Sequence, residues 1–196
     1  MRLSISGTVL LVGACMITGI SAMGQNQNVT AKQTGTFDVA ITYNADRSSS
    51  LGGNDFWMQG GGVQLHGRFW KGLGAVADVS AAHTNDMTGT GVGLDIVTAT
   101  FGPRYTFALP KQHAEFFAQA LGGVANGFNS TFPGFYGATS VAQGMAIDIG
   151  GGVNVPLSRR FAVRALQASW IRTDLSNTQK NVENHLQLGS GIVVRF

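Results

Sequence analysis

The feature that most constrains the fold of this sequence is an alternation of apolar and polar side chains with a period of two residues. In the stretch TFDVAITYN, residues 36–44, large apolar side chains occupy every second position from Phe37 to Tyr43. The last stretch, HLQLGSGIVVRF at 185–196, alternates in the same way, with Val193 as the exception on its polar parity. Since successive side chains of a strand point to opposite faces, each stretch predicts a strand with one apolar and one polar face.

Segments of this kind follow one another along the chain and predict an all-β fold with eight strands. The expected strands cover approximately 36–44, 56–68, 73–83, 92–109, 114–125, 142–155, 161–174 and 185–196. Their connections alternate between long and short, and the short ones, at 70–72, 110–112 and 156–159, all fall at the same end. This order predicts an antiparallel up-and-down barrel with short turns at one end and longer loops at the other, as in transmembrane β-barrels.

The composition favours strands in a lipid environment. Charged residues make up 12% of the chain, about half the usual share of a soluble domain, and 28 of the 196 residues are glycine. No apolar run after residue 24 is long enough to cross a membrane as a helix. Removing Arg2 with the N-terminal segment leaves 12 of the 13 basic residues against 10 acidic ones, without a run of Lys or Arg. Nucleic acid is therefore not an expected partner.

The first 24 residues have the layout of a secretory signal peptide. Arg2 gives a positive start, a mostly apolar stretch follows, and small residues offer cleavage after Ala22 or after Gly24. A transmembrane anchor is the alternative, but glycines and threonines interrupt this short apolar stretch. We therefore expect an exported protein, in which residues 25–35 form a polar leader and residues 36–196 form the barrel domain.

The only cysteine, Cys15, lies inside the expected signal peptide. Lipidation at Cys15 is disfavoured because the apolar stretch continues beyond it and the leader before it would be short. The exported domain then has no disulfide and needs another source of stability.

The closing strand decides between a barrel in lipid and a barrel in water. An open sheet edge in lipid would leave backbone groups unpaired, so the last strand is expected to close against the first. Its apolar face, ending in Phe196, would meet lipid, while Gln187 and Arg195 would face the interior. A soluble periplasmic barrel of the lipocalin kind requires large apolar side chains inside. The opposite parity is rich in Gly, Asp, Gln, Thr and Arg, which favours a narrow polar lumen; the soluble barrel stays open as an alternative.

The charged residues of the expected strands fall on or near the polar parity. A charge that faces lipid at mid-depth costs on the order of 2–4 kcal/mol, so these side chains are expected to point inward and pair there. Side chains fill the interior of an eight-stranded barrel, so we expect a polar network that closes the lumen, with a narrow ion-conducting pore as the alternative. The expected members of this network are Asp78, Arg104, Glu115, Asp148, Arg164 and Arg195.

Aromatic residues near the strand ends predict girdles at the two membrane interfaces. The expected outer girdle contains Tyr43, Phe56, Trp57 and Trp170, and the expected inner girdle contains Phe69, Trp70, Phe107, Phe161 and Phe196.

The signal peptide, the eight alternating strands and the final V-V-R-F resemble the OmpA-type transmembrane domain and the OmpX/Ail group of small outer-membrane barrels. FGPRYTF at 101–107 and FAVRALQASW at 161–170 are similar to mid-chain strands of such proteins. The resemblance implies a place in the outer membrane of a Gram-negative envelope, in contact with lipid and lipopolysaccharide. Full-length OmpA-type proteins continue into a peptidoglycan-binding domain; this chain stops at Phe196, so cell-wall anchoring is not expected.

The resemblance also assigns a role to the last strand. In the family, the alternating apolar residues and the terminal Phe of this strand are the signal that the barrel-insertion machinery reads. Here those positions are Leu188, Ile192, Val194 and Phe196.

Four histidines, at 66, 83, 113 and 185, raise the alternative of an enzyme that modifies lipid A. An acyl hydrolase needs a Ser hydroxyl beside a His that a carboxylate orients. PagL-like barrels carry this as a closely spaced His-x-Ser, which the sequence lacks; the corresponding stretch here is His185-Leu186-Gln187. We therefore expect no enzymatic activity, no metal site and no cofactor.

The remaining functional signal is the longest loop, NGFNSTFPGFYGATS at 126–140, which is rich in aromatic and small polar residues. Loops on a rigid scaffold often carry function. The function expected from the sequence is therefore structural or surface interaction, with an extracellular ligand contacted by the longer loops.

Overall fold

The computed structural model describes residues 37–49, 55–86, 93–109, 113–130, 132–134, 137–175 and 182–196. The expected signal peptide, its cleavage sites and the polar leader lie outside these residues. No helix in the described part of the chain is long and apolar enough to cross a membrane.

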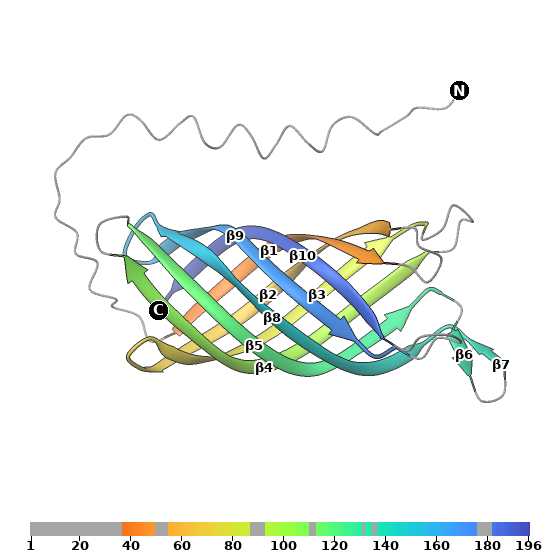
Figure 1. Ribbon diagram of the computed structural model, residues 1–196. Helices are drawn as coiled ribbons and strands as arrows, with labels where there is room; N and C mark the ends of the chain where they lie inside the picture. Colours follow the sequence, from red (N-terminus) through yellow and green to blue (C-terminus); the bar gives the residue numbers. More distant parts are fainter. Residues whose placement is uncertain are drawn as a thin grey trace, which may run out of the picture. The chain divides into compact units, whose positions relative to one another are not determined.

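The chain forms antiparallel strands, most of which join in one closed barrel (Figure 1). The strands are β1 (Phe37–Ser49), β2 (Asp55–Trp70), β3 (Leu73–Thr84), β4 (Leu94–Leu109), β5 (Ala114–Phe128), β6 (Phe132–Gly134), β7 (Gly137–Thr139), β8 (Ala142–Pro156), β9 (Phe161–Thr173) and β10 (Glu183–Arg195). The barrel has the order β1-β10-β9-β8-β5-β4-β3-β2, which confirms the predicted eight-stranded up-and-down barrel.

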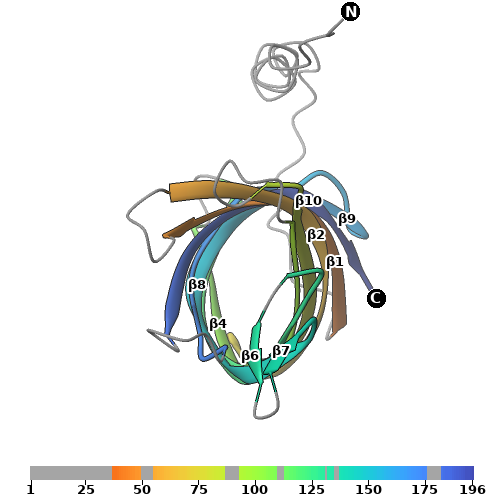
Figure 2. The ribbon, with the colours of Figure 1, turned by 90° about the vertical axis from the view of Figure 1, so that its right-hand side faces the viewer.

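The segment between β5 and β8 differs from the prediction. The sequence predicts a loop there, but β6 and β7 pair as a short hairpin outside the barrel sheet. This hairpin lies at the end of the barrel that carries the long connections, as the end-on view of the strand ring shows (Figure 2). The alternation signal is absent here because each hairpin strand has only three residues.

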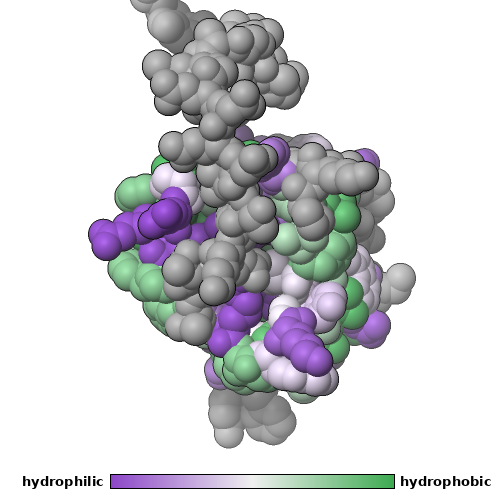
Figure 3. All heavy atoms as spheres, turned by 90° about the vertical axis from the view of Figure 1, so that its left-hand side faces the viewer, coloured by the Kyte–Doolittle hydropathy of each residue, from purple (hydrophilic) through white to green (hydrophobic). Residues whose placement is uncertain are grey.

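The two ends of the barrel differ in construction. One end holds Phe37 and the C-terminal Phe196, and we call it the terminal end. There the backbone N–H of Phe196 donates to the carbonyl oxygen of Phe37 at 2.9 Å, and the centroids of the two rings lie 6.2 Å apart. The short turns lie at the same end, and in one of them Gly72 has a φ of +91°, where a Cβ would lie 2.4 Å from the carbonyl oxygen of Thr106. Figure 3 views this end and shows hydrophobic side chains along parts of its periphery, with hydrophilic ones among them. The opposite end is the loop end.

The wall of the barrel is apolar outside and polar inside over most of its height. Outward side chains such as Ile41, Phe101 and Met145 are more than 60% exposed, whereas inward Gln64 and Arg164 are 1% exposed. This arrangement is opposite to the one that a soluble lipocalin-like barrel requires.

The barrel closes where β1 pairs with β10, and this pairing is the closing seam. Ile41 stands opposite Ile192 on the outer wall, and Asp38 stands opposite Arg195 on the inner one. The strands approach closely at Gly191, where a Cβ would lie 2.0 Å from the carbonyl oxygen of Ile41. Val193, the apolar residue on the otherwise polar parity of β10, points inward and is 2% exposed.

One β-bulge explains why the face assignment of β9 is ambiguous in the sequence. Arg164 points inward, Ala165 and Leu166 both point outward, and Gln167 points inward again. The pairings with β8 and β10 shift register at this point, so Ala165 is the additional residue. The bulge reverses the parity of the second half of the strand, and Arg172 consequently points outward.

The aromatic side chains mostly follow the predicted girdles, with one correction. Tyr43, Trp57 and Trp170 are exposed near the loop end. All five aromatics predicted for the inner girdle are also exposed, and they lie near the terminal end. Phe56 instead packs against a buried apolar cluster inside the barrel. It precedes Trp57 by one residue, and adjacent positions of a strand face opposite sides, so both could not join the outer girdle.

Candidate functional site

The structure places every residue of the predicted network inside the barrel. Each comes from a different strand, between β3 and β10, and each is between 1% and 8% exposed: Asp78, Arg104, Glu115, Asp148, Arg164 and Arg195. They form two groups, one around Arg104 and Arg164 and one at the terminal end.

Arg104 of β4 connects three strands across the lumen. Its Nε donates to Oε1 of Gln119 at 3.1 Å, and its Nη2 also reaches Oε1 of Gln64. Gln119 extends this hydrogen-bond network to β8, because its Nε2 donates to Oδ2 of Asp148 at 3.1 Å. Asp78 and Asp148 lie within electrostatic range of the Arg104 guanidinium and oppose its charge.

Arg164 of β9 approaches the same acceptor from the other side. Its Nη1 donates to Oε1 of Gln64 and, at 2.7 Å, to Oε1 of Gln167, while its Nε donates to Oδ1 of Asn154 at 3.1 Å. Gln64 of β2 therefore accepts from both arginines and joins strands on opposite sides of the barrel. Buried polar groups stabilise a fold only when they are paired in this way.

Phe117 lies between the two arginines and is the residue that the sequence does not assign to the site. The Cζ atom of Arg104 lies 4.2 Å from the centroid of its ring, and the Cζ atom of Arg164 lies 4.7 Å from it. The ring is 4% exposed. An aromatic face attracts a guanidinium, so Phe117 offsets part of the repulsion between two like charges. The sequence contains a signal for this position, because Phe117 shares the parity of Glu115 and Gln119 and opposes that of Phe116.

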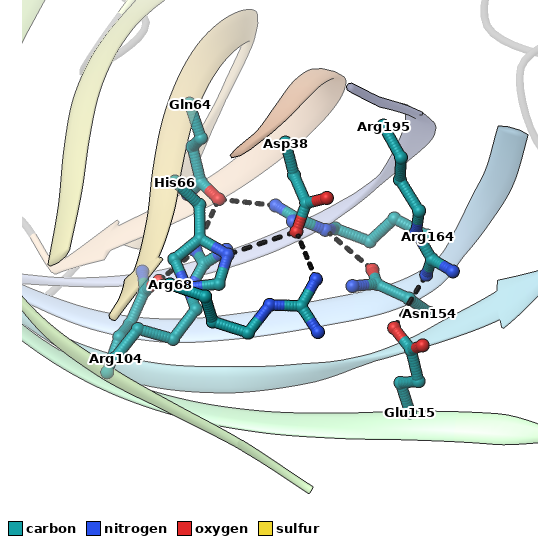
Figure 4. Close-up of polar contacts among 10 residues, drawn as sticks. Asp38, Gln64, His66, Arg68, Arg104, Glu115, Asn154, Arg164 and Arg195 are labelled. Carbon is teal, nitrogen blue, oxygen red and sulfur yellow. Dashed lines mark hydrogen bonds and ion pairs between the residues drawn. The ribbon is translucent and has the colours of Figure 1, made fainter. Parts of the chain in front are cut away.

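The second group lies at the terminal end (Figure 4). Nη2 of Arg195 donates to Oε2 of Glu115 at 2.6 Å, which links β10 with β5 across the lumen. Asp38 of β1 receives hydrogen bonds on Oδ2 from Nδ1 of His66 and from Nη2 of Arg68, both at 3.1 Å. The carboxylate as acceptor fixes the proton of His66 on Nδ1.

The loop end of the lumen carries a cluster of apolar side chains. This apolar cap consists of Met58, Ala82, Leu94, Ile96, Ala125, Phe132, Ala142, Ala146 and Leu175, with Phe56 packed against it. Phe132 comes from the β6–β7 hairpin, and a Cβ at Gly127 would lie 2.8 Å from its Cζ. The absence of a side chain at residue 127 therefore lets the hairpin place an aromatic ring over the lumen.

A polar cluster lies on the outer wall at the loop end, beyond the membrane-spanning part of the strands. Nδ1 of His83 hydrogen-bonds to Oδ1 of Asp95, and Nε2 of His83 lies 3.0 Å from Oδ1 of Asn85. Asn129, with a φ of +56°, donates to the other oxygen of Asp95. The hydrogen bond that His83 donates to Asp95 raises the pKa of His83 above 6.5, with Asn85 adding to the effect, and the same bond lowers the pKa of Asp95 below 3.8.

The four histidines lie in different parts of the described structure. His66 and His185 point into the lumen, His83 lies on the outer wall, and His113 lies in a turn at the terminal end. Within the described ranges, no three His, Cys, Asp or Glu side chains lie close enough together to hold a metal ion. The polar lumen is instead a set of hydrogen bonds and ion pairs between strands.

Comparison with known proteins defines the fold. No protein-family model matches the sequence, and no curated protein sequence matches it significantly. Among solved structures, the barrel is similar to Neisserial surface protein A, with a TM-score of 0.63 and 15% identity over 82% of this chain and 97% of that one.

Two further structures are similar at comparable coverage. The attachment invasion locus protein Ail of Yersinia pestis has a TM-score of 0.57 and 15% identity over 83% of this chain and 99% of that one. The outer membrane protein OprG of Pseudomonas aeruginosa has a TM-score of 0.51 and 12% identity over 83% and 96%. The predicted resemblance to small outer-membrane barrels is thereby confirmed at the level of the fold.

Proposed function

We propose that this protein is an outer-membrane barrel with a closed lumen, whose loop end makes its functional contacts outside the cell. The observation that carries the membrane location is the distribution of side chains: aromatic and aliphatic residues cover most of the outer wall, and most charges of the strands lie inside. Water would not stabilise such an exterior, whereas lipid would. The similar fold of outer-membrane proteins supports the same location.

The closed lumen is supported by the side chains that cross it. Arg104, Phe117 and Arg164 stack across the interior, and the apolar cap covers its loop end. The best-defined cavities in the described residues measure about 10 and 20 Å³, room for roughly one water molecule each. A narrow ion-conducting pore is the second candidate, which the polar lining favours, and it requires these side chains to move apart.

The interaction role is supported by the asymmetry of the two ends. The terminal end has short turns, whereas the loop end carries the β6–β7 hairpin with exposed Thr139, Ser140 and Val141. One similar structure is described as an attachment invasion locus protein and another as a surface protein. We infer that the hairpin contacts an extracellular ligand, while the wall contacts lipid and lipopolysaccharide and the last strand contacts the barrel-insertion machinery during assembly.

The first experiment tests the membrane barrel and the closed lumen together. The outer-membrane fraction is run unboiled and boiled on a detergent gel, and the purified protein is added to liposomes that contain a small fluorescent dye. We expect a band that shifts on boiling and no dye release. A protein recovered in the periplasmic extract would overturn the location, and rapid dye release would favour the pore.

The second experiment tests the interaction role. Residues 133–139 are replaced by a short Gly-Ser linker, so that Phe132 is kept in the cap, and binding of the bacteria to host cells and matrix proteins is compared with the native protein. We expect binding to fall while the heat shift is retained. Unchanged binding would limit the protein to a structural role.

A further inference from the structure

A small cavity lies in the lumen directly beneath the apolar cap. It measures about 20 Å³, and Met58, Ala82, Ile96 and Ile171 line its apolar side. Its polar lining is made by Asp46, Ser80, Thr98, Thr173, His185 and Gln187. The cavity is separate from the arginine group and takes no part in the function proposed above.

Two buried polar atoms in this lining lack a partner among the described residues. Asp46 is 5% exposed and His185 is 3% exposed, and neither Oδ1 of Asp46 nor Nδ1 of His185 makes a hydrogen bond to the described protein groups. Within the lining, the Ser80 and Thr98 hydroxyls lie 2.7 Å apart, and the Thr173 hydroxyl lies 3.3 Å from Nε2 of His185. Next to the lining, the buried Oγ of Ser48, opposite His185, also lacks a partner among the described residues. Buried polar atoms are rarely left unpaired, because each loses its hydration.

The two atoms belong to the two strands of the closing seam. Asp46 of β1 stands opposite Gln187 of β10, and His185 stands opposite Ser48, so Asp46 and His185 are diagonal neighbours on the inner wall. Diagonal neighbours on adjacent strands lie roughly 7–8 Å apart, which is too far for a direct hydrogen bond between short side chains. One bridging molecule fits this distance.

Water is the ligand whose chemistry and size fit this place. A site for one water needs roughly 10–15 Å³ and two to four polar partners, and both conditions are met. Water can donate to the Asp46 carboxylate and can either accept from or donate to His185, so it satisfies both tautomers. An anion would be repelled by Asp46, and the described residues supply too few carboxylate and imidazole groups for a metal ion.

We propose that this cavity binds one ordered water molecule that hydrogen-bonds to both Asp46 and His185 and thereby joins the first and last strands of the barrel. The water completes the seam at the loop end, as the backbone contact between Phe196 and Phe37 does at the terminal end. The seam is the one pairing between strands that are distant in sequence, so a specific link there acts on closure of the whole barrel.

The proposal is tested first on the native protein in lipid nanodiscs. In an NMR experiment, magnetisation transfer from water should give a cross-peak to protons of His185, and this cross-peak should show the long residence time of a buried water. The result does not depend on any variant folding. Its absence, with the His185 signals assigned, would overturn the proposal.

The contribution of the bridge to stability is then measured in three variants: Asp46→Leu, His185→Phe and the double variant. Each single change leaves the other polar atom buried and unpaired, so we expect thermal unfolding in detergent to become roughly tenfold faster. The double variant removes both ends of the bridge, so its unfolding rate should rise by less than the product of the two single effects; Thr173 loses its contact with His185, and Gln187 its contact with Asp46, in the double variant as in the respective single one. Ser190→Ala, on the outer wall of the same seam opposite Tyr43, is the matched control and should change nothing. Additive losses in the double variant would contradict a shared water.

Discussion

At the scale of single residues, Phe117 has the strongest predicted effect on stability. Phe117→Ala removes a 4%-exposed ring and leaves two guanidinium groups without the aromatic face between them. We expect a loss of about 3–5 kcal/mol for this change. Phe117→Leu keeps most of the volume but not the π face and should lose about 1–2 kcal/mol. Urea unfolding in micelles measures both, and a Leu variant as stable as the native protein would mean that packing alone explains the residue.

His83 predicts a pH dependence at the loop end. Its pKa is raised above 6.5 by the hydrogen bond with Asp95, so its contribution is complete below pH 6.5 and is lost as the pH rises through the raised value. The lowered pKa of Asp95 has the opposite sign: its contribution is complete above pH 3.8 and is lost as the pH falls through the lowered value. The contact between His83 and Asp95 is therefore strongest between pH 3.8 and 6.5.

An NMR titration of His83 checks this dependence. In Asp95→Asn the midpoint of His83 should move down toward its ordinary value, because the partner no longer carries a charge. Asp174→Asn removes a carboxylate that is not bonded to His83 and serves as the control. Equal midpoints in the native protein and Asp95→Asn would show that the two side chains do not interact in solution.

At the scale of elements, the bulge in β9 takes up one additional residue and keeps Arg164 and Gln167 both on the inner face. Deleting Ala165 removes the bulge and restores strict alternation, with Arg164 and Gln167 still inside and Leu166 outside between them. No polar side chain is turned toward lipid, so we expect the deletion variant to show the same heat-modifiable band in the membrane fraction as the native protein. Ala165→Leu, which keeps the bulge and adds an apolar side chain to the outer wall, should assemble like the native protein. Loss of the band in the deletion variant would mean that the bulge itself, and not only the faces of the flanking residues, is required for assembly.

The same elements show how far the sequence predicts the structure. Strands such as β1 and β10 are readable because lipid on one side and a polar lumen on the other separate the two parities completely. The bulge is not readable, since Ala165 is small and either face accepts it. The face of Phe117 is readable, because it shares the parity of Glu115 and Gln119, but its contact with the two arginines depends on the strands that meet around it.

Six charged members of the candidate site were predictable, whereas its neutral members and the group of Asp38, His66 and Arg68 were not. A charge on a membrane strand has one acceptable direction, so Arg104 and Arg164 could be placed inside from the sequence alone. Gln64 and Gln119 could not be singled out, because their roles depend on which strands meet across the lumen. The apolar cap was missed for a related reason: Phe132 reaches it from a hairpin that lacks any periodicity.

At the scale of the whole molecule, the lumen has two obstacles in series: the stacked Arg104, Phe117 and Arg164, and the apolar cap over the loop end. Resistances in series add, so the larger remaining obstacle limits the current when one is removed. We therefore expect Phe117→Ser and Phe132→Ser each to leave planar-bilayer conductance near that of the native protein, and the double variant to conduct measurably. Phe107→Ser, on the outer wall, is the control for a general loosening of the barrel. Conductance that rises fully in Phe132→Ser alone would mean that the cap is the sole barrier and that the arginine stack passes ions.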